Sequence, residues 1–453
     1  MLWYFLQFAL TPLFPTFFKR LQSKNIERAR VKGPLLIAMN HPNSFMDAMA
    51  FTYLLQFPRT YFMARGDAFK KGIVSKLLYS IGLLPIFRFK DVGYESAKKN
   101  VDSFKMVHKK LAERRKLIVF AEGYSIQERR LIPIKKGTAK MALSFIEQGG
   151  RDDIQILPVG VTYSTPSKFR GDAYFQVGEP ILVKDYYEEY KQHAPQAIIK
   201  LTKEIEDRLK PLTLNLNDKE NDVAIEQLQF ILKKQYIEEH HLNYHKLEDH
   251  QKYWEFIVAK LNDVTSKHPK ETVSFREEVD GYYNELKQLK LRDHLIYAAS
   301  KSKSYLTVAN LFLLLVGFPI YAIGKVLNFI PYYYAKRIAD KTCKNIEFYT
   351  AVNFGVGSLI LIVLLPIEVL IIWLLFKTTN ATLIYIFLKS ACGFMGLQYT
   401  TFKKKILGAF RLKKIKNTNP SLYNKLLKQR GLIINFIMRP ETLVEHHNTI
   451  NNK

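Results

Sequence analysis

Between residues 33 and 182, short apolar runs alternate with longer segments in which apolar residues recur at helical spacing. The runs that predict strands are GPLLIAMN, RTYFMAR, LLPIFRF, KLIVFAEG, IQILPVGVTY and DAYFQVGEPILV. The segments that predict helices are SFMDAMAFTYLLQF, FKKGIVSKLLYSIG, YESAKKNVDSFKMVHKKLAERR and GTAKMALSFIEQGG. This alternation predicts an α/β fold, a layered unit with a mostly buried central sheet. Functional side chains are then expected on loops at the strand ends.

After Lys184 the pattern becomes helical. Glu, Lys, Gln, Tyr and Leu recur at helical spacing, with prolines between the segments, so we expect a helical region to about residue 300. His241 and His245 stand four apart and could share a helix face as metal ligands. The Glu that follows the first His of a metalloprotease helix is missing, so we prefer a solvated polar face and expect no metal.

The C-terminal part of the chain contains long apolar segments. The segment 351–376 exceeds the length of about 20 apolar residues that crosses a bilayer. A polar turn and the apolar segment 381–399 follow, which predicts a membrane hairpin with basic flanks and hence both ends in the cytoplasm. The segment 307–324 is basic on both sides, and we expect a re-entrant or interfacial helix pair broken at Pro319. A buried helical core is the alternative, kept open by Glu368.

The first 18 residues carry no charged side chain. They lack the basic start and the small-residue cleavage site of a signal peptide, so we expect none to be removed. Because Pro12 and Pro15 would break a spanning helix, we expect an interfacial membrane segment instead. The aromatic residues that would enter the headgroup boundary are Trp3, Tyr4, Phe5 and Phe8. The alternative is a helix that packs on the α/β unit.

The charge of the chain indicates an anionic partner. Lys and Arg number 68 against 41 Asp and Glu, which gives a net charge of +27. Nucleic acid and an anionic membrane both fit, but the 13% aromatic content and the apolar segments favour the membrane, and we expect no nucleic-acid partner. The only two cysteines, Cys343 and Cys392, are far from any Cys/His ligand spacing, which excludes a disulfide scaffold and a zinc site.

These patterns divide the chain into five parts. They are an N-terminal interfacial segment (1–32), the α/β domain (33–215), a helical region (216–300), membrane-embedded helices (301–402) and a basic C-terminal tail (403–453). We expect a membrane protein with its α/β domain on the cytoplasmic face. The oligomeric state has no sequence signal.

The stretch MNHPNSFMDAM contains the first candidate for chemistry. His41 follows the strand GPLLIAMN, where its side chain would emerge at the carboxyl edge of the sheet. A neutral imidazole can take a proton from an alcohol if the Asp47 carboxylate holds its other ring nitrogen. The alternative is structural: with Ser44 as helix N-cap, Asp47 falls at the third helical position, which is a capping-box variant.

Three further stretches follow in order on successive elements. GLLPIFRF places Arg88 at a strand end, VFAEGYS places Glu122 and Gly123 at another, and ILPVGVTY is a buried strand. With NHPNSFMD, these stretches resemble the four ordered blocks of the glycerophospholipid acyltransferase superfamily, which includes glycerol-3-phosphate and 1-acylglycerol-3-phosphate acyltransferases. The blocks lie within residues 33–182, about a third of the chain.

The resemblance implies an acyltransferase domain and a role for each matching residue. His41 would be the general base, Asp47 its partner and Arg88 a phosphate ligand. The residues that would shape the acceptor site are Glu122, Gly123, Ser125 and Lys136. The acyl donor would be an acyl thioester, acyl-CoA or acyl carrier protein, with no other cofactor. The acceptor would be glycerol phosphate or a lysophospholipid, beside membrane lipid.

Two departures from the family pattern concern the acceptor. Five residues separate His41 from Asp47 instead of four, a form that resembles the glycerol-3-phosphate and dihydroxyacetone-phosphate branch. The third block has Ser125 in place of its usual phosphate-binding Arg. Arg129, Arg130, Lys135 or Lys136 could replace it, and we choose Lys136 because PIKKGTAKMAL resembles the family's next segment.

Two alternative functions remain open at the level of the sequence. A lysophospholipid acyltransferase with a larger or uncharged acceptor fits the loss of the Arg. A non-catalytic basic membrane or nucleic-acid adaptor fits the net charge and the basic clusters between residues 403 and 416.

Overall fold

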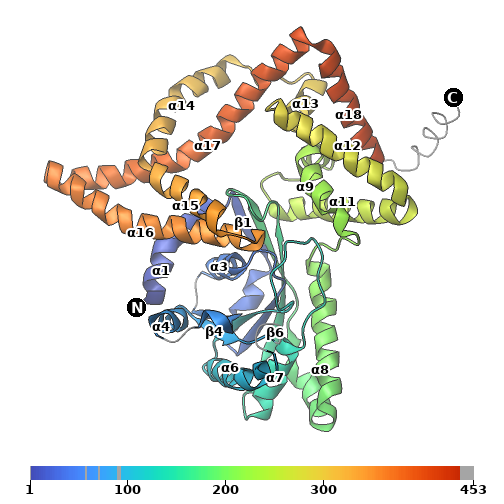
Figure 1. Ribbon diagram of the computed structural model, residues 1–453, viewed down its shortest axis with the longest axis vertical. Helices are drawn as coiled ribbons and strands as arrows, with labels where there is room; N and C mark the ends of the chain where they lie inside the picture. The colour runs from blue at the N-terminus through green and yellow to red at the C-terminus, as the bar shows by residue number, and fades with distance from the viewer. Residues whose placement is uncertain (1, 57–58, 70–71, 89–92, 439–453) are drawn as a thin grey trace. The chain divides into compact units, whose positions relative to one another are not determined.

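The computed structural model describes residues 2–56, 59–69, 72–88 and 93–438. The chain forms two compact units, Met1–Asn215 with Ala339–Phe354 and Leu216–Ile338 with Gly355–Lys453 (Figure 1). Each unit is described by itself below.

The first unit is built on one sheet. In the described residues it has eight strands: β1 (Arg20–Lys24), β2 (Leu35–Met39), β3 (Thr60–Arg65), β4 (Leu83–Ile86), β5 (Lys116–Phe120), β6 (Gln155–Tyr163), β7 (Asp172–Val177) and β8 (Ile181–Leu182). Their order is β1-β7-β6-β2-β5-β3-β4, and β8 pairs with β6. The five strands from β6 to β4 run parallel, whereas β7 and β8 are antiparallel to β6.

Strand β2 lies at the centre of the sheet because it has no polar face. All of its residues are buried, and β5 and β6 pair with its two edges in parallel. Leu35 and Ile37 point into one core with α3 (Phe45–Leu54). Leu36 points into the opposite core with α6 (Glu95–Ala112), α7 (Gly137–Glu147) and α8 (Tyr187–Leu209). The side chain that follows the strand therefore emerges between two packed layers.

The α/β class with a mostly buried sheet is confirmed, and the predicted strands and helices between residues 33 and 182 form. The segment before residue 33 differs from the expectation. After α1 (Leu2–Leu10) and α2 (Phe14–Phe17), β1 joins the sheet in parallel with β7. Tyr4, Phe5 and Phe8 are exposed, whereas Phe14 and Phe17 are buried in the core. An interfacial segment over all of residues 1–32 is therefore wrong; only α1 keeps exposed aromatic side chains. Between β3 and β4 the first unit also contains helix α4 (Ile73–Ser80).

The second unit is helical in its described residues. Its first helices are α9 (Asp222–Ile231), α10 (Lys233–Glu239), α11 (Leu247–Lys267), α12 (Pro269–Gln288) and α13 (Asp293–Ser300). They confirm the expected helical region. The later helices are α14 (Val308–Leu327), α15 (Phe329–Thr342), α16 (Tyr349–Phe376), α17 (Thr379–Thr418) and α18 (Pro420–Met438), of which α15 and α16 contribute the segment Ala339–Phe354 to the first unit.

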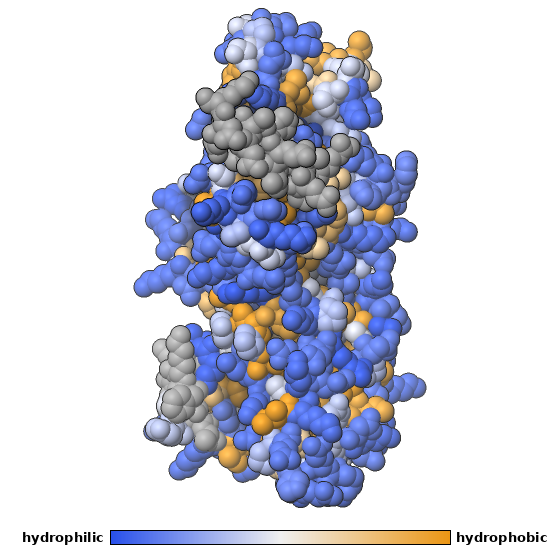
Figure 2. Space-filling view, turned by 90° about the vertical axis from the view of Figure 1, so that its right-hand side faces the viewer, coloured by the Kyte–Doolittle hydropathy of each residue, from blue (hydrophilic) through white to orange (hydrophobic). Residues whose placement is uncertain are grey.

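Three helices, α14, α16 and α17, are long and apolar enough to cross a membrane. None of the most apolar window of α16 is buried, which argues against a buried helical core. Helices α16 and α17 are joined by a two-residue connection, so the predicted hairpin forms. Apolar side chains also reach the surface on the face shown in Figure 2, as patches within a mostly hydrophilic surface.

Helix α14 corrects the expectation of a break at Pro319. It is one continuous helix that contains this proline. Proline is tolerated in apolar helices when neighbouring groups support the backbone, and the Tyr399 hydroxyl of α17 donates to the Leu314 carbonyl, one residue before the carbonyl that Pro319 leaves without its helical donor. A side-chain carbon at Gly324 would collide with the Cys392 backbone, which shows how closely α14 and α17 pack.

The residues from 403 to Met438, which the sequence analysis assigns to a basic C-terminal tail, are helical. Helix α17 continues to Thr418 and α18 follows it. Arg430 of α18 is buried and donates from Nε to Asp293 of α13 at 2.8 Å. An exposed tail cannot form there because its apolar and charged groups have partners within the helical unit.

One buried ion pair joins the two arms of the hairpin. The Lys389 ammonium of α17 donates to the Glu368 carboxylate of α16, and the Lys389 side chain is 5% exposed. In an apolar environment, removing one member of such a pair leaves an uncompensated charge.

We expect Lys389→Met to lower the free energy of unfolding by about 3 kcal/mol, because Glu368, whose side chain is 24% exposed, then loses its cationic partner. The double variant Glu368→Gln/Lys389→Met should recover most of that loss. Denaturant unfolding of the full chain in detergent measures both, with Lys377→Met at the exposed connection as the matched control. A double variant as unstable as Lys389→Met would contradict this account of the pair.

Candidate active site

The turn between β2 and α3 is fixed by its backbone partners. The Asn40 side chain continues the pairing of β2 with β6, since its Nδ2 donates to the Val161 carbonyl (3.1 Å) and its Oδ1 accepts from the Val161 N–H (2.8 Å). Ser44 has a φ of +47°, which non-glycine residues rarely adopt, and its N–H donates to Ser125 Oγ (3.0 Å). This turn places His41 at the carboxyl edge of the sheet.

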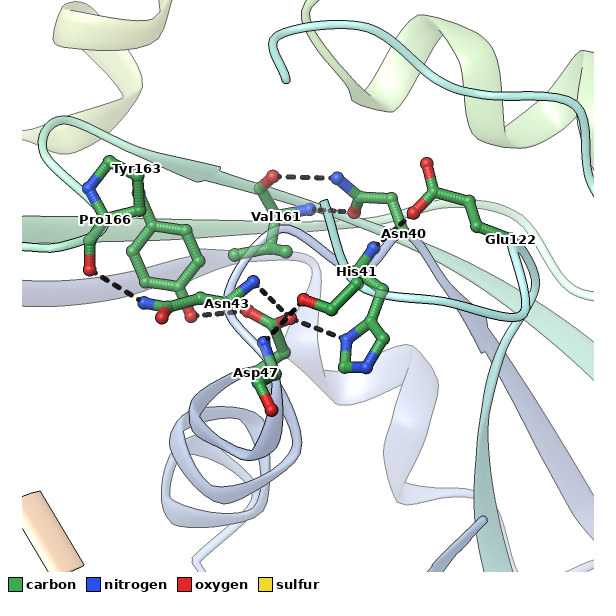
Figure 3. A network of polar contacts seen from close by, with 10 residues as sticks. Asn40, His41, Asn43, Asp47, Glu122, Val161, Tyr163 and Pro166 are labelled. Atoms are coloured by element: carbon green, nitrogen blue, oxygen red, sulfur yellow. Dashed lines mark hydrogen bonds and ion pairs between the residues drawn. The ribbon is translucent and has the colours of Figure 1, made fainter. Parts of the chain in front are cut away.

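His41 and Asp47 form the pair that the sequence predicts. The His41 Nδ1 lies 2.9 Å from Asp47 Oδ2 (Figure 3). The Asp47 side chain is 0% exposed and that of His41 is 13% exposed, so the carboxylate is inaccessible and the imidazole is within reach of solvent. Because an ionised carboxylate only accepts, Nδ1 carries the hydrogen and Nε2 keeps a lone pair. In the described structure, Nε2 has no hydrogen-bond partner.

Two further donors hold the Asp47 carboxylate. The Asn43 N–H donates to Oδ2 (2.9 Å) and the Tyr163 hydroxyl donates to Oδ1 (2.7 Å) (Figure 3). Burial, followed by the charge of Asp47, raises the pKa of Tyr163 well above its ordinary value, so the phenol keeps its hydrogen. A buried carboxylate needs such partners, because an unpaired buried charge costs several kcal/mol.

The capping alternative is resolved by the same contacts. The Ser44 side chain makes no capping hydrogen bond, so the first half of a capping box is absent. Asp47 does accept one backbone N–H of the turn, that of Asn43, while its same oxygen faces His41. The acid therefore stabilises the start of α3 and also orients the imidazole.

The His41 ring is packed as well as hydrogen-bonded. It stacks on Phe120, the last residue of β5, with ring centroids 3.4 Å apart and planes 13° apart. This contact and the Asp47 bond fix the ring plane from two directions. A ring fixed in this way has little conformational freedom left to lose if a ligand binds at Nε2.

Glu122 connects the loop after β2 with the loop after β5. Its side chain is buried, Oε2 accepts the His41 N–H (2.7 Å) and Oε1 accepts the Ile132 N–H (3.2 Å). Burial raises the pKa of Glu122 to about 7, and the Asp47 charge acts in the same direction against the two backbone donors. Both oxygens face the backbone, so Glu122 supports the loop that carries His41 and is not at an open surface.

The remaining predicted residues gather beside this loop, with one exception. Arg88 Nη1 donates to the Gly123 carbonyl (3.4 Å), and Ser125 accepts from the turn as described. The Lys135 side chain lies against Gly123, since a Cβ there would be 3.1 Å from Lys135 Cγ. Lys136 precedes α7 with an exposed side chain, and no described contact joins it to the loop.

Sequence reasoning missed Asn43, Tyr163 and Phe120. Asn43 lies inside the quoted first block, and its Nδ2 also donates to the Pro166 carbonyl (3.0 Å). Tyr163 ends the fourth block, and β2 and β6 are paired in parallel, so their carboxyl ends meet. That strand order, which periodicity does not determine, is the signal that would have identified Tyr163.

The Glu122 carboxyl predicts a pH-dependent stability. Its ordinary pKa is 4.5 and its folded pKa is about 7, so between these values the unfolded chain has released the proton while the folded chain holds it. Rising pH therefore favours unfolding through this group. We expect the melting temperature of wild type minus that of Glu122→Gln to fall as the pH rises from about 5 to about 8. A difference that stays constant or rises would contradict a raised pKa.

Comparison with known proteins agrees with this geometry. Residues 20–162 match the family model described as acyltransferase. The chain is 26% identical over 208 residues to an uncharacterized acyltransferase of Schizosaccharomyces pombe, which covers 44% of this chain and 28% of that protein. It is 33% identical over 128 residues to glycerol-3-phosphate O-acyltransferase 2 of Saccharomyces cerevisiae, which covers 28% of this chain and 17% of that protein.

A second yeast relative and one solved structure extend this set. Glycerol-3-phosphate O-acyltransferase 1 of Saccharomyces cerevisiae is 29% identical over 135 residues, covering 29% of this chain and 18% of that protein. The chain thus spans less than a third of the length of these curated relatives. The 1-acyl-sn-glycerophosphate acyltransferase PlsC of Thermotoga maritima gives a TM-score of 0.30 at 15% identity, covering 46% of this chain and 94% of that one. Residues 20–162 thus resemble the acyltransferase family, and over this third of the chain the relatives include two glycerol-3-phosphate O-acyltransferases.

Proposed function

We propose that this protein is a membrane-associated O-acyltransferase that transfers an acyl group from an acyl thioester to the hydroxyl of glycerol-3-phosphate or 1-acylglycerol-3-phosphate. The observation that carries the proposal is the His41–Asp47 pair, with Nδ1 held at 2.9 Å and Nε2 free of described partners. An imidazole in this state can remove a hydroxyl proton in the transition state.

The reaction follows from that geometry. The acceptor hydroxyl loses its proton to His41 Nε2 as its oxygen attacks the thioester carbonyl, and the C–O bond forms. Asp47 stabilises the resulting imidazolium. When the C–S bond breaks, the imidazolium returns the proton to the leaving thiolate, so the products are an ester and a thiol. No acyl-enzyme intermediate is needed.

The acceptor assignment rests on charge beside the base and on the relatives' names. Arg88 at the end of β4 contacts the Gly123 carbonyl, and Lys135 lies against the same loop, so two cations flank it. A guanidinium suits a phosphate because it offers several donors in one plane. The two yeast relatives are named glycerol-3-phosphate O-acyltransferases, which makes glycerol-3-phosphate the first acceptor to test.

The membrane location fits a lipid product. Helices α14, α16 and α17 are candidate spans, and we propose that the basic flanks of the hairpin keep its ends, and the α/β unit, in the cytoplasm. Acyl-CoA or acyl carrier protein would then reach the site from the same compartment.

Removing the base should abolish most of the transfer. We expect His41→Ala and Asp47→Asn each to lower thiol release from acyl-CoA by about 10²–10⁴-fold, because the first removes the proton acceptor and the second its orienting charge. His193→Ala, an exposed histidine on α8, should keep wild-type activity and serves as the matched control.

An acceptor panel in the same assay separates the alternatives. Glycerol-3-phosphate, 1-acylglycerol-3-phosphate and a lysophosphatidylcholine are compared. Activity with lysophosphatidylcholine alone would favour a remodelling enzyme over our proposal. Thiol release in none of the reactions would favour a non-catalytic adaptor, and equal activity of His41→Ala and wild type would remove the histidine mechanism.

Arg88 should act on acceptor binding more than on the chemical step. We expect Arg88→Gln to raise KM for glycerol-3-phosphate by about 10-fold or more, because a charge-assisted hydrogen bond contributes about 1.5–3 kcal/mol. KM for acyl-CoA should stay within about two-fold. Arg151→Gln, which removes an exposed arginine before β6, is the control. An unchanged KM for the acceptor would exclude Arg88 as its phosphate ligand.

A further inference from the structure

A group of basic side chains surrounds Tyr305 in the helical unit. Tyr305 lies in the loop between α13 and α14, and the Lys405 ammonium of α17 sits 3.7 Å from its ring centroid. Lys234 of α10 donates to the Tyr305 hydroxyl from Nζ (3.0 Å). The His294 ring of α13 meets the Tyr305 ring edge-on at 6.1 Å between centroids. Three helices of one unit thus converge on one aromatic residue.

This group carries excess positive charge. Lys405 has no carboxylate partner in the described part of the chain. The carboxylate near Lys234 is Glu238, 3.6 Å away, and Glu238 also accepts from the Tyr297 hydroxyl (2.9 Å). Glu238 is therefore the one carboxylate described beside these two lysines, and it lies next to Lys234 alone, so the positive charge of the group is not balanced.

His294 adds a polar atom that lacks a partner. Its Nε2 is buried and makes no hydrogen bond in the described structure. Burial, and then the charges of Arg292, Lys234 and Lys405, lower the pKa of His294 to about 4, so the ring is neutral at physiological pH. A buried polar atom without a partner costs free energy that a bound ligand with an accessible oxygen would recover.

The group lies at the end of two candidate membrane helices. Tyr305 precedes α14 by three residues, and Lys405 follows the apolar half of α17, beside which α14 runs antiparallel. Contacts of Gly324 with Cys392 and of Tyr399 with Leu314 establish that pairing. Residues just beyond the apolar part of a span lie at the depth of lipid headgroups.

We propose that Lys405, Lys234, His294 and Tyr305 form a binding site for a phosphate group, that of an anionic phospholipid at the membrane surface. Phosphate oxygens accept several hydrogen bonds from different directions, which matches two lysines that approach from α10 and α17 and a neutral histidine that approaches from α13. The Tyr305 hydroxyl accepts from Lys234 and keeps its own hydrogen to donate. The site is separate from the acyltransferase site and does not depend on its activity.

The test measures binding without an acyl donor. Because phosphatidate is also the product of acylating 1-acylglycerol-3-phosphate, only the part of its binding that Lys405→Gln removes is assigned to this site, and that part stands apart from the enzymatic proposal. Full-length protein in nonionic detergent is titrated with dioctanoyl phosphatidate, dioctanoyl phosphatidylcholine and inorganic phosphate, and Kd is measured by thermophoresis. We expect phosphatidate to bind more tightly than phosphatidylcholine. Lys405→Gln should weaken phosphatidate binding by about five-fold, the contribution of one lysine near an anionic surface.

Lys404→Gln is the matched control, because it removes the same charge from the exposed neighbour on the same helix. It should leave Kd unchanged, and His294→Phe, which keeps a ring and removes the nitrogen, should weaken binding. If inorganic phosphate binds as tightly as phosphatidate and Lys405→Gln abolishes its binding, the phosphate site is confirmed, but its ligand is a soluble phosphate and not a lipid. Equal losses in Lys404→Gln and Lys405→Gln, equal binding of phosphatidylcholine, or no binding of either phosphate probe would overturn the site.

Discussion

The buried carboxylate of Asp47 is the constraint on which the α/β unit's chemistry depends. It is fully inaccessible and accepts from the His41 ring, the Asn43 backbone and the Tyr163 hydroxyl. A charge in such a place is tolerated only if donors surround it, so the turn, the end of β6 and the start of α3 must all take the positions observed. The imidazole is one of those donors, and it therefore has little freedom to turn away.

A second carboxyl, that of Glu122, fixes the other side of the same turn. It binds the His41 backbone N–H and the Ile132 N–H, and so joins the loop after β2 to the loop after β5. Neighbouring parallel strands bring these two loops to one edge of the sheet, which is where ligands bind in such folds. Two carboxyls thus have different roles: Asp47 sets the ring and Glu122 sets the backbone that carries it.

The sequence predicts those parts of this site that depend on residues close together in the chain. The alternation of apolar runs identifies β2, and the position of His41 after it, with Asp47 on the first turn of α3, is enough to expect the pair. The direction in which the Glu122 side chain points could not be predicted. It depends on a hydrogen bond from the Ile132 N–H, and Ile132 lies ten residues later in an irregular loop whose path the sequence pattern does not give. The role of Tyr163 required the strand order, in which β6 lies beside β2 although β3, β4 and β5 come between them in the chain.

The error at Pro319 has a physical cause that a local pattern does not contain. Proline favours a break in a helix, and tertiary packing outweighs that preference in α14, whereas the lysines after residue 402 are good helix formers and α17 continues through them. Helix α14 is supported by the backbone of α17, and α17 continues into a unit where Arg430 of α18 reaches Asp293. Such partners lie tens of residues away in the chain, so a local pattern does not contain them.

The ring tautomer of His41 tests the central claim most directly. If Asp47 holds the imidazole as described, ¹⁵N NMR of the histidine-labelled protein at neutral pH will show His41 with its hydrogen on Nδ1 and a bare Nε2, assigned by comparison with His41→Ala. The same spectrum of Asp47→Ala, which removes the acceptor oxygen at Nδ1, should lose that preference. A His41 protonated at Nε2 in the wild type, or a tautomer unchanged by Asp47→Ala, would contradict the account.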